Sequence, residues 1–153
     1  MNVTIPGVGI YELRTIVLDL NGTLSVRGKL LPGVAIRITK LLKAGFRIML
    51  FSGDTRGTAA QIARKLGIEL VVTASADDKA REFKKCCAKT AVAIGNGQID
   101  VRMLRAARLS IVTLQAEGVH TQALLAADIV VTSINDALDI LLDPRTLIST
   151  LRC

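Results

Sequence analysis

The sequence has few aromatic residues, few cysteines and no long apolar run. Its 153 residues include no Trp, one Tyr and three Phe, so a core must be built from aliphatic side chains. Three cysteines, two of them adjacent, form no spaced framework of the kind that stabilises small secreted domains. The apolar stretches are far too short to cross a bilayer, and no basic segment followed by an apolar one marks the N-terminus. We therefore expect reduced thiols, a cytoplasmic location and no membrane association.

Positive charge is in excess but is not gathered into runs. Lys and Arg number 20 against 13 Asp and Glu, which gives a formal net charge of +7. Such a surface can attract nucleic acid or anionic metabolites. No run of Lys or Arg exceeds two residues, and Tyr11 is the single tyrosine. We therefore expect a solvated basic surface, and a nucleic-acid-binding module is the weakest alternative.

Short apolar runs alternate with segments of helical periodicity along the chain. Its length and its 50% hydrophobic content suit one folded domain, which we expect to cover residues 1–153. The expected strands are 15–18, 47–51, 69–72, 90–94, 109–113 and 129–132, and the expected helices include 34–44, 55–66 and 77–87. Continuous apolar strands separated by amphipathic helices predict a three-layer α/β fold with a mostly parallel sheet.

The first residues differ from this pattern. Two short strand-like segments, 2–5 and 10–13, flank Pro6-Gly7-Val8-Gly9 and predict an N-terminal β-hairpin. Its edge could pair with a second copy of the chain.

Polar side chains follow several of the expected strands. They are Asp19 and Asn21 after the first strand, Ser52 and Asp54 after the second, and Asn96 and Asp100 after the fourth. Because parallel sheets bind ligands beyond the carboxyl ends of their strands, we expect these side chains to form a site.

Four short motifs occur in order along the chain. They are Asp19-Leu20-Asn21-Gly22-Thr23, Phe51-Ser52-Gly53-Asp54, Asp77-Asp78-Lys79 and Gly95-Asn96-Gly97-Gln98-Ile99-Asp100. Together they resemble the four motifs of the haloacid dehalogenase (HAD) superfamily. Spacing and flanking residues, including 52–56 and 125–130, are most similar to the phosphorylation domain of P-type ATPases. The resemblance extends from Leu13 onward and implies a Rossmann-like HAD fold.

The resemblance also implies a Mg²⁺-dependent phosphohydrolase or phosphotransferase that forms an aspartyl-phosphate on Asp19. The catalytic residues that it implies are Asp19, Asn21, Ser52 and Lys79. The implied phosphate contacts are Asp19, Asn21, Gly22, Ser52, Gly53 and Lys79. The implied magnesium ligands are Asp19, the main-chain carbonyl of Asn21, Asn96 and Asp100.

Two positions depart from the family pattern. Asn21 stands where the family's phosphatases carry an acidic residue that protonates the leaving group and then activates water. Losing a general acid/base costs about 10²–10⁴-fold in rate. Asn96 replaces the first acid of the fourth motif, which removes a negative charge from the implied metal site. We therefore expect slow turnover and weak Mg²⁺ binding. The alternative is a catalytically degenerate member that binds phosphate or a protein partner.

Other residues fit a structural role. Asp54 and Arg56 could start the helix that follows, and Asp100 could cap a helix. We expect Lys84 and Lys85 to form a solvated face. We expect Cys86 and Cys87 to pack within a helix, His120 to lie at the surface, and Gly97 to let the backbone approach the site. Asp128 and Asp136 are expected to have a structural role.

The gaps between the motifs leave no room for a cap domain. Residues 19–52 suffice for a flap and one helix, and residues 52–79 for a helix and a strand. Segment 24–30 resembles the family's flap hairpin, with Arg27 and Lys29 near its tip. Without a cap the site should be open to a small phosphorylated substrate or a phosphoprotein. We expect a neighbouring subunit to close it, and therefore a homo-oligomer.

Overall fold

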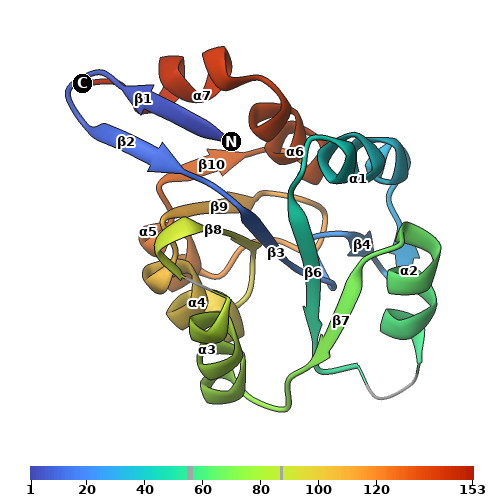
Figure 1. The fold of residues 1–153 in the computed structure, drawn as a ribbon. Helices are drawn as coiled ribbons and strands as arrows, with labels where there is room; N and C mark the ends of the chain where they lie inside the picture. The colour runs from blue at the N-terminus through green and yellow to red at the C-terminus, as the bar shows by residue number, and fades with distance from the viewer. Residues whose placement is uncertain (55–56, 87) are drawn as a thin grey trace.

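The computed structural model describes residues 1–54, 57–86 and 88–153 (Figure 1). Within them a six-stranded sheet runs in the order β10-β9-β8-β3-β6-β7, and each strand is parallel to its neighbours. Its strands are β3 (Thr15–Asp19), β6 (Arg47–Ser52), β7 (Glu69–Val72), β8 (Ala91–Gly95), β9 (Leu109–Thr113) and β10 (Ile129–Val131). The predicted parallel sheet is confirmed.

Helices cover both faces of this sheet. One face carries α1 (Val34–Lys43), α2 (Thr58–Leu66), α6 (Ile134–Leu142) and α7 (Pro144–Leu151) (Figure 1). The other carries α3 (Ala76–Lys85), α4 (Val101–Ala106) and α5 (Thr121–Ala126). Two 3₁₀ turns, η1 (Ala88–Thr90) and η2 (Gln98–Asp100), precede β8 and α4. The three-layer fold is confirmed, whereas its extent as one domain stays a prediction.

The position of the central strand β3 explains why its sequence is continuously apolar. Ile16 and Leu18 point into the layer beneath α1 and α6, while Val17 points into the layer beneath α3 and α4. All five residues of β3 are buried, because helices cover both faces. The strand therefore delivers Asp19 from the middle of the core to the edge where its neighbours also end.

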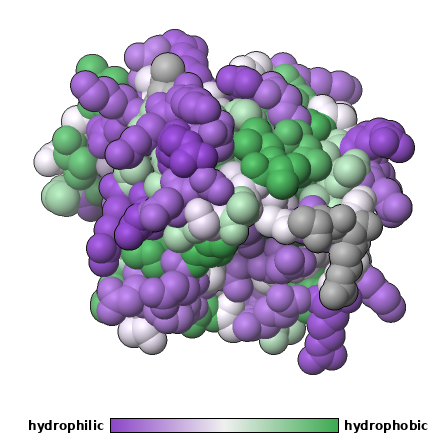
Figure 2. Space-filling view, turned by 90° about the horizontal axis from the view of Figure 1, so that it is seen from below, coloured by the Kyte–Doolittle hydropathy of each residue, from purple (hydrophilic) through white to green (hydrophobic). Residues whose placement is uncertain are grey.

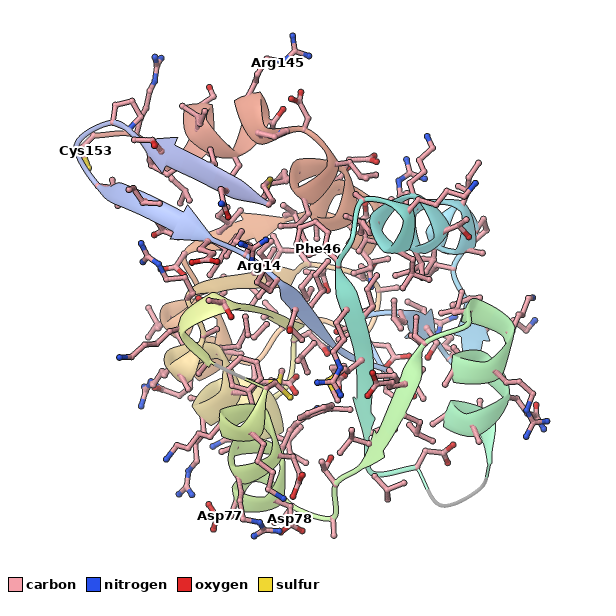
Figure 3. All side chains as sticks on the ribbon, viewed as in Figure 1. Arg14, Phe46, Asp77, Asp78, Arg145 and Cys153 are labelled. Carbon is pink, nitrogen blue, oxygen red and sulfur yellow. The ribbon has the colours of Figure 1, made fainter. Side chains whose placement is uncertain are left out.

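The third motif opens α3 with a well-capped first turn. Ser75 Oγ accepts a hydrogen bond from Asp78 N at 3.1 Å, and so the helix begins at Ala76, one residue earlier than expected. Asp77 and Asp78 lie in this first turn (Figure 3), where carboxylates interact favourably with the helix dipole. The turn places Lys79 on the buried side of α3. The expected helix boundaries at residues 55 and 87 lie outside the described residues.

The predicted N-terminal hairpin is present. It consists of β1 (Asn2–Ile5) and β2 (Gly9–Glu12), paired antiparallel from Asn2↔Glu12 to Ile5↔Gly9. Its turn contacts the other end of the chain, where Cys153 N donates to Pro6 O at 3.3 Å (Figure 3). Helix α7 packs against β1. Pairing of the hairpin with a second copy stays a prediction.

No cap domain interrupts the described residues between the motifs. Between Asp19 and Ser52 the chain forms only the flap hairpin β4 (Ser25–Val26) and β5 (Lys29–Leu30) and then α1. Between Ser52 and Lys79 it forms α2 and β7. In the part of the chain that the structure describes, no helix has the length and apolar character needed to cross a membrane.

Candidate active site

A cavity of about 540 Å³ lies at the carboxyl ends of β3, β6 and β8. It draws residues from all four motifs and from the flap: Asp19, Leu20, Asn21, Gly28, Ser52, Gly53, Asp54, Thr58, Lys79, Asn96, Gly97, Ile99 and Asp100. Figure 2 views the molecule from this end, where the surface is largely hydrophilic with hydrophobic patches between. The polar strand ends therefore converge as the sequence predicted.

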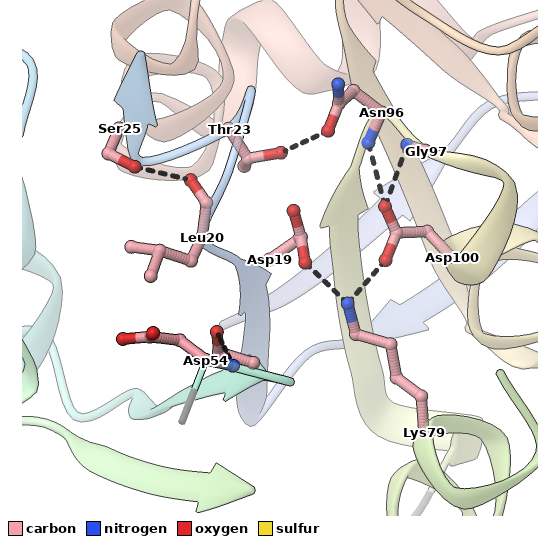
Figure 4. A network of polar contacts seen from close by, with 10 residues as sticks. Asp19, Leu20, Thr23, Ser25, Asp54, Lys79, Asn96, Gly97 and Asp100 are labelled. Carbon is pink, nitrogen blue, oxygen red and sulfur yellow. Dashed lines mark hydrogen bonds and ion pairs between the residues drawn. The ribbon is translucent and has the colours of Figure 1, made fainter. Parts of the chain in front are cut away.

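Lys79 joins two carboxylates at the floor of the cavity (Figure 4). Its Nζ lies 2.5 Å from Asp19 Oδ1 and 2.6 Å from Asp100 Oδ1. Lys79 is 1% exposed and Asp100 is 0% exposed, whereas Asp19 keeps 9% of its surface accessible. The third motif thus supplies the counter-charge for the first and the fourth, and Asp19 is the carboxylate of the two that a ligand can reach.

Burial and mutual charge shift the acidity of these groups. Burial, followed by the negative charge of Asp100, raises the pKa of Asp19 to about 7, although Lys79 and the main-chain N–H of Leu20 oppose the shift. Burial alone would lower the pKa of Lys79, but the charges of Asp19 and Asp100 outweigh it and hold that pKa above its usual range. The site therefore keeps a cation beside the carboxylate that faces the cavity.

Asp100 is held within this floor by hydrogen bonds to both carboxylate oxygens. Its Oδ2 accepts hydrogen bonds from Asn96 N at 3.0 Å and Gly97 N at 2.9 Å, while Oδ1 faces Lys79. A Cβ atom at Gly95 would lie 2.6 Å from Asp100 Cγ, so this position requires glycine. Asp100 occupies the N-cap position of α4, but its side chain does not cap that helix. Its predicted metal role stays a prediction that this geometry disfavours.

Asn96 is held at both ends of its amide. Oδ1 accepts from Thr23 Oγ1 at 3.3 Å, and Nδ2 donates to Gly118 O at 2.9 Å. Gly22 (φ 77°) passes so close that a Cβ there would lie 2.2 Å from Asn96 Nδ2. Asn96 therefore connects the turn of the first motif to the loop after β9, a connection that the sequence motif did not reveal.

The second motif lines the opposite wall. Ser52 is 3% exposed, and its Oγ accepts a hydrogen bond from Asp54 N at 3.1 Å, which leaves the hydroxyl hydrogen for a group in the cavity. Gly53 passes close to the end of β7, since a Cβ there would lie 3.0 Å from Thr73 O, which is a tight contact. Asp54 Oδ2 accepts from Ala59 N at 2.7 Å. Its side chain thus contacts the first turn of α2, although Asp54 lies before that helix begins at Thr58, and Arg56 lies outside the described residues.

Asn21 and Gly22, also in the first motif, differ in whether they line the cavity. Asn21 is exposed and lines the cavity. Gly22 does not line it, because its N–H donates to Ser25 O at 2.8 Å and its carbonyl faces β9. Gly22 therefore shapes the turn with its N–H engaged by Ser25 O, and its phosphate contact stays a prediction.

The structural interpretations of the other residues hold wherever the structure describes them. Lys84 and Lys85 are exposed, and Cys86 packs against Met49 with its Sγ 3.5 Å from Sδ. His120 is exposed at the start of α5. The supporting carboxylates are Asp128, which accepts from Ser110 N at 2.8 Å, and Asp136, which accepts from Ser133 Oγ at 2.7 Å. Cys87 lies outside the described residues.

The donors in the cavity fit magnesium in kind. The Asp19 carboxylate, the Asn21 main-chain carbonyl and Asn96 Oδ1 are hard oxygen donors of the class that Mg²⁺ prefers. The described lining carries three carboxylates against one lysine, which is a formal excess of two negative charges. Only one donor in this set is a carboxylate. Among the described residues, no group of three or more His, Cys, Asp or Glu is placed to hold a metal.

Comparison with known proteins gives relatives of the chain in sequence and in fold. No family model matches the chain. It is 32% identical over 128 residues to a soluble P-type ATPase-like phosphatase of Methanocaldococcus jannaschii, covering 80% of this chain and 46% of that protein. It is also 45% identical over 64 residues to an uncharacterised protein of the same organism, covering 42% of this chain and 69% of the relative. The chain thus spans about half the length of the phosphatase.

Solved structures show the same fold at low sequence identity. The 3-deoxy-D-manno-octulosonate 8-phosphate phosphatase of Moraxella catarrhalis, in complex with magnesium, phosphate and KDO, superposes with a TM-score of 0.71 at 17% identity. The two chains are covered to 92% and 94%. A structure described as a HAD superfamily hydrolase from Legionella pneumophila gives 0.75 at 14% identity, with 92% and 87% covered. Fold, motif order and the phosphatase relative agree: the chain belongs to the HAD-like superfamily, is similar to a P-type ATPase-like phosphatase, and has no cap domain within its described residues.

Proposed function

We propose that the chain is a Mg²⁺-dependent phosphohydrolase or phosphotransferase that forms an aspartyl-phosphate on Asp19. The observation that carries the proposal is the placement of Asp19, which opens to the cavity while Lys79 Nζ lies 2.5 Å behind it. A carboxylate oxygen can attack phosphorus there as the bond to the leaving oxygen breaks. Water then attacks the same phosphorus, releases phosphate and restores the carboxylate.

Each wall of the cavity has a part in this chemistry. Ser52 would donate its hydroxyl hydrogen to a phosphoryl oxygen, and the main-chain N–H of Gly53 would face the same group. Lys79 would offset charge on the phosphoryl group and on Asp19. Bound Mg²⁺ would supply further positive charge, held by Asp19, the Asn21 carbonyl and Asn96. The formal excess of two negative charges in the described lining supports the need for a cation before a phosphate dianion binds.

Release of the phosphoryl group is expected to be slow. Asn21 stands at the cavity where an acidic side chain would protonate the leaving group and later deprotonate water, and an amide does neither. The phosphoenzyme should therefore be long-lived. A degenerate member that only binds phosphate is the second candidate, because the Asn96 amide is already committed to Thr23 and Gly118.

Trapping of the phosphoenzyme tests the proposal. Wild type and Asp19→Asn are incubated with acetyl phosphate labelled with ³²P, with Mg²⁺ or with EDTA, and hydrolysis of p-nitrophenyl phosphate is measured in parallel. We expect a hydroxylamine-sensitive label only in wild type with Mg²⁺. The control is Asp78→Asn, a first-turn carboxylate that does not line the cavity. Equal label in wild type and Asp19→Asn would overturn the proposal, and phosphate binding without label would favour the second candidate.

We also propose the setting in which the site works. The open cavity suits a small phosphorylated substrate or a phosphoprotein, with a second copy of the chain closing it in a cytoplasmic homo-oligomer. A monomer in light scattering would contradict the oligomer. Nucleic acid remains an unlikely partner, and a salt-sensitive electrophoretic shift with generic RNA would reverse that expectation.

A further inference from the structure

Gln115, in the loop between β9 and α5, uses its whole side-chain amide. Nε2 donates to Gly22 O at 2.9 Å and to Thr23 O at 2.7 Å, and Oε1 accepts from Ile134 N at 2.7 Å. A glutamine amide has two N–H donors and one oxygen acceptor, so both donors are engaged and the oxygen is bound. No sequence motif drew attention to this residue, yet its contacts reach the first motif.

The two carbonyls that it binds belong to the turn after the nucleophile. Gly22 and Thr23 follow Asp19-Leu20-Asn21, and Gly22 has a φ of 77°. Gly22 O also accepts a hydrogen bond from Thr113 Oγ1 at 3.2 Å. The direction of these carbonyls determines where the preceding main chain lies, which includes the Asn21 carbonyl and the backbone that carries Asp19.

The oxygen of Gln115 binds a rigid element. Ile134 is the first residue of α6, and the N–H groups in the first turn of a helix have no partner within it. A separate side chain, Ser133 Oγ, accepts from Asp136 N at 3.2 Å in the same turn. Gln115 therefore connects the turn of the first motif to the end of a packed helix, and Ser133 stabilises that helix end without touching the turn.

The same loop holds two other walls of the cavity. Glu117 Oε1 accepts a hydrogen bond from Arg27 N at the tip of the flap. Gly118 O accepts from Asn96 Nδ2 at 2.9 Å, and His120 N donates to Asn96 O at 2.8 Å. Residues 115–120 thus contact the first motif, the flap and the fourth motif within one short segment.

We propose that Gln115 is a positioning residue for phosphoryl transfer, which rests on the function proposed for Asp19. It acts through the turn at Gly22 and Thr23, not by touching the substrate. Two carbonyls of that turn are held from one side chain, and the side chain is itself held by α6. Loss of these bonds should allow the turn to shift, and a shift of about 1 Å in reacting groups can cost about 10²-fold in rate.

A matched pair of variants tests this role. Gln115→Met keeps a similar length and removes all three hydrogen bonds, whereas Ser133→Ala removes the side-chain cap of the same helix end and the hydrogen bond from Ser133 Oγ to Asp136. With p-nitrophenyl phosphate, we expect kcat of Gln115→Met to fall about 10–100-fold while KM changes less than threefold. We expect kcat of Ser133→Ala to stay within twofold of wild type. An unchanged kcat in Gln115→Met, or the same loss in both variants, would overturn the proposal.

A second measurement tests the positioning role of Gln115 without an activity assay. Amide hydrogen exchange of Gly22 and Thr23 is followed by NMR in both variants and in Gln115→Glu. The glutamate keeps the acceptor for Ile134 N but turns an oxygen toward the two carbonyls. We expect exchange at Gly22 and Thr23 at least tenfold faster in both Gln115 variants, and unchanged in Ser133→Ala. Unchanged exchange in the Gln115 variants would refute the positioning role. An inactive wild type with faster exchange in these variants would refute the proposed function alone.

Discussion

Two parts of the same cavity differ in how completely they are equipped. The uptake half, formed by Asp19, Ser52 and Lys79, is nearly buried and carries the charges and the hydroxyl that phosphoryl transfer needs. The release half, formed by Asn21 and Asn96, is neutral. Asn21 is exposed, and the Asn96 amide is bound to neighbouring loops. The proposed function therefore predicts that variants of each half separate acceptance of a phosphoryl group from its release.

The largest effect is expected from Lys79→Met, in the uptake half. The change leaves Asp19 and Asp100 near each other in a buried site with no counter-charge. Removing one partner of a buried ion pair typically costs about 3–5 kcal/mol. We expect the urea midpoint to fall by a corresponding amount and phosphoenzyme formation to disappear. Lys84→Met, on the exposed face of the same helix, serves as the control and should change neither measurement. A Lys79→Met protein as stable as wild type would contradict the buried bridge.

Asn21→Asp should repair the release half. An added carboxyl group at the cavity can protonate the leaving group and activate water, which is worth about 10²–10⁴-fold. We expect steady-state hydrolysis of p-nitrophenyl phosphate to rise within that range and the lifetime of the phosphoenzyme to shorten. Asn21→Ala is the matched control, and its rate should stay close to that of wild type because Asn transfers no proton. A rate for Asn21→Asp equal to that of the alanine variant would place the deficit elsewhere in the cavity.

Asn96→Asp should have two opposed effects. The carboxylate adds negative charge to the magnesium donors, so we expect the Mg²⁺ concentration for half-maximal activity to fall by about tenfold. It also loses the N–H that donates to Gly118 O, and a partly buried hydrogen bond of this kind contributes about 0.5–1.5 kcal/mol. Titration of activity with Mg²⁺ and thermal unfolding measure the two effects separately. Tighter Mg²⁺ dependence with no loss of Tm would show that Gly118 O finds another donor.

The smallest effect is expected from Glu117→Ala, which affects the access to both halves. Glu117 is exposed and its carboxylate accepts only one hydrogen bond in the described residues, from Arg27 N at the flap tip. An exposed bond of this kind contributes about 0.5–1.5 kcal/mol to its local geometry. We expect KM to change two- to fivefold while kcat and Tm stay near their wild-type values. A large loss of kcat would mean that the flap contributes to the chemistry itself.

Much of the fold was accessible from the sequence because its signals are local. Continuous apolar runs such as 15–18 reflect burial on both faces of a sheet, and the turn at Gly7 and Gly9 predicts a hairpin from backbone preferences alone. The ends of a helix differed from the sequence prediction where a neighbouring side chain determined them. Ser75, for example, moved the start of α3 to Ala76 by capping it.

The site was only partly accessible from the sequence. Motif order identified Asp19, Ser52 and Lys79, and the structure brings all three to one cavity. Motif order did not reveal that Asp100 faces Lys79 and two main-chain N–H groups. Nor did it reveal that the N–H of Gly22 donates to Ser25 O. Motifs record which residue types recur at a position. They do not record the direction in which a side chain or carbonyl points once the loops are packed.

The sequence by itself determined the alternation of strands and helices and the polar residues at the strand ends, because each depends on neighbours within a few positions. Only the tertiary structure decided which of these residues share contacts. Gln115 and Gly22 are 93 residues apart, yet their hydrogen bond helps to fix the turn beside Asp19. Such a bond depends on the pairing of β9 with β8 and of β8 with β3, and on the position of α6. No local pattern around residue 115 could specify it, because its partners are brought together only by the completed sheet.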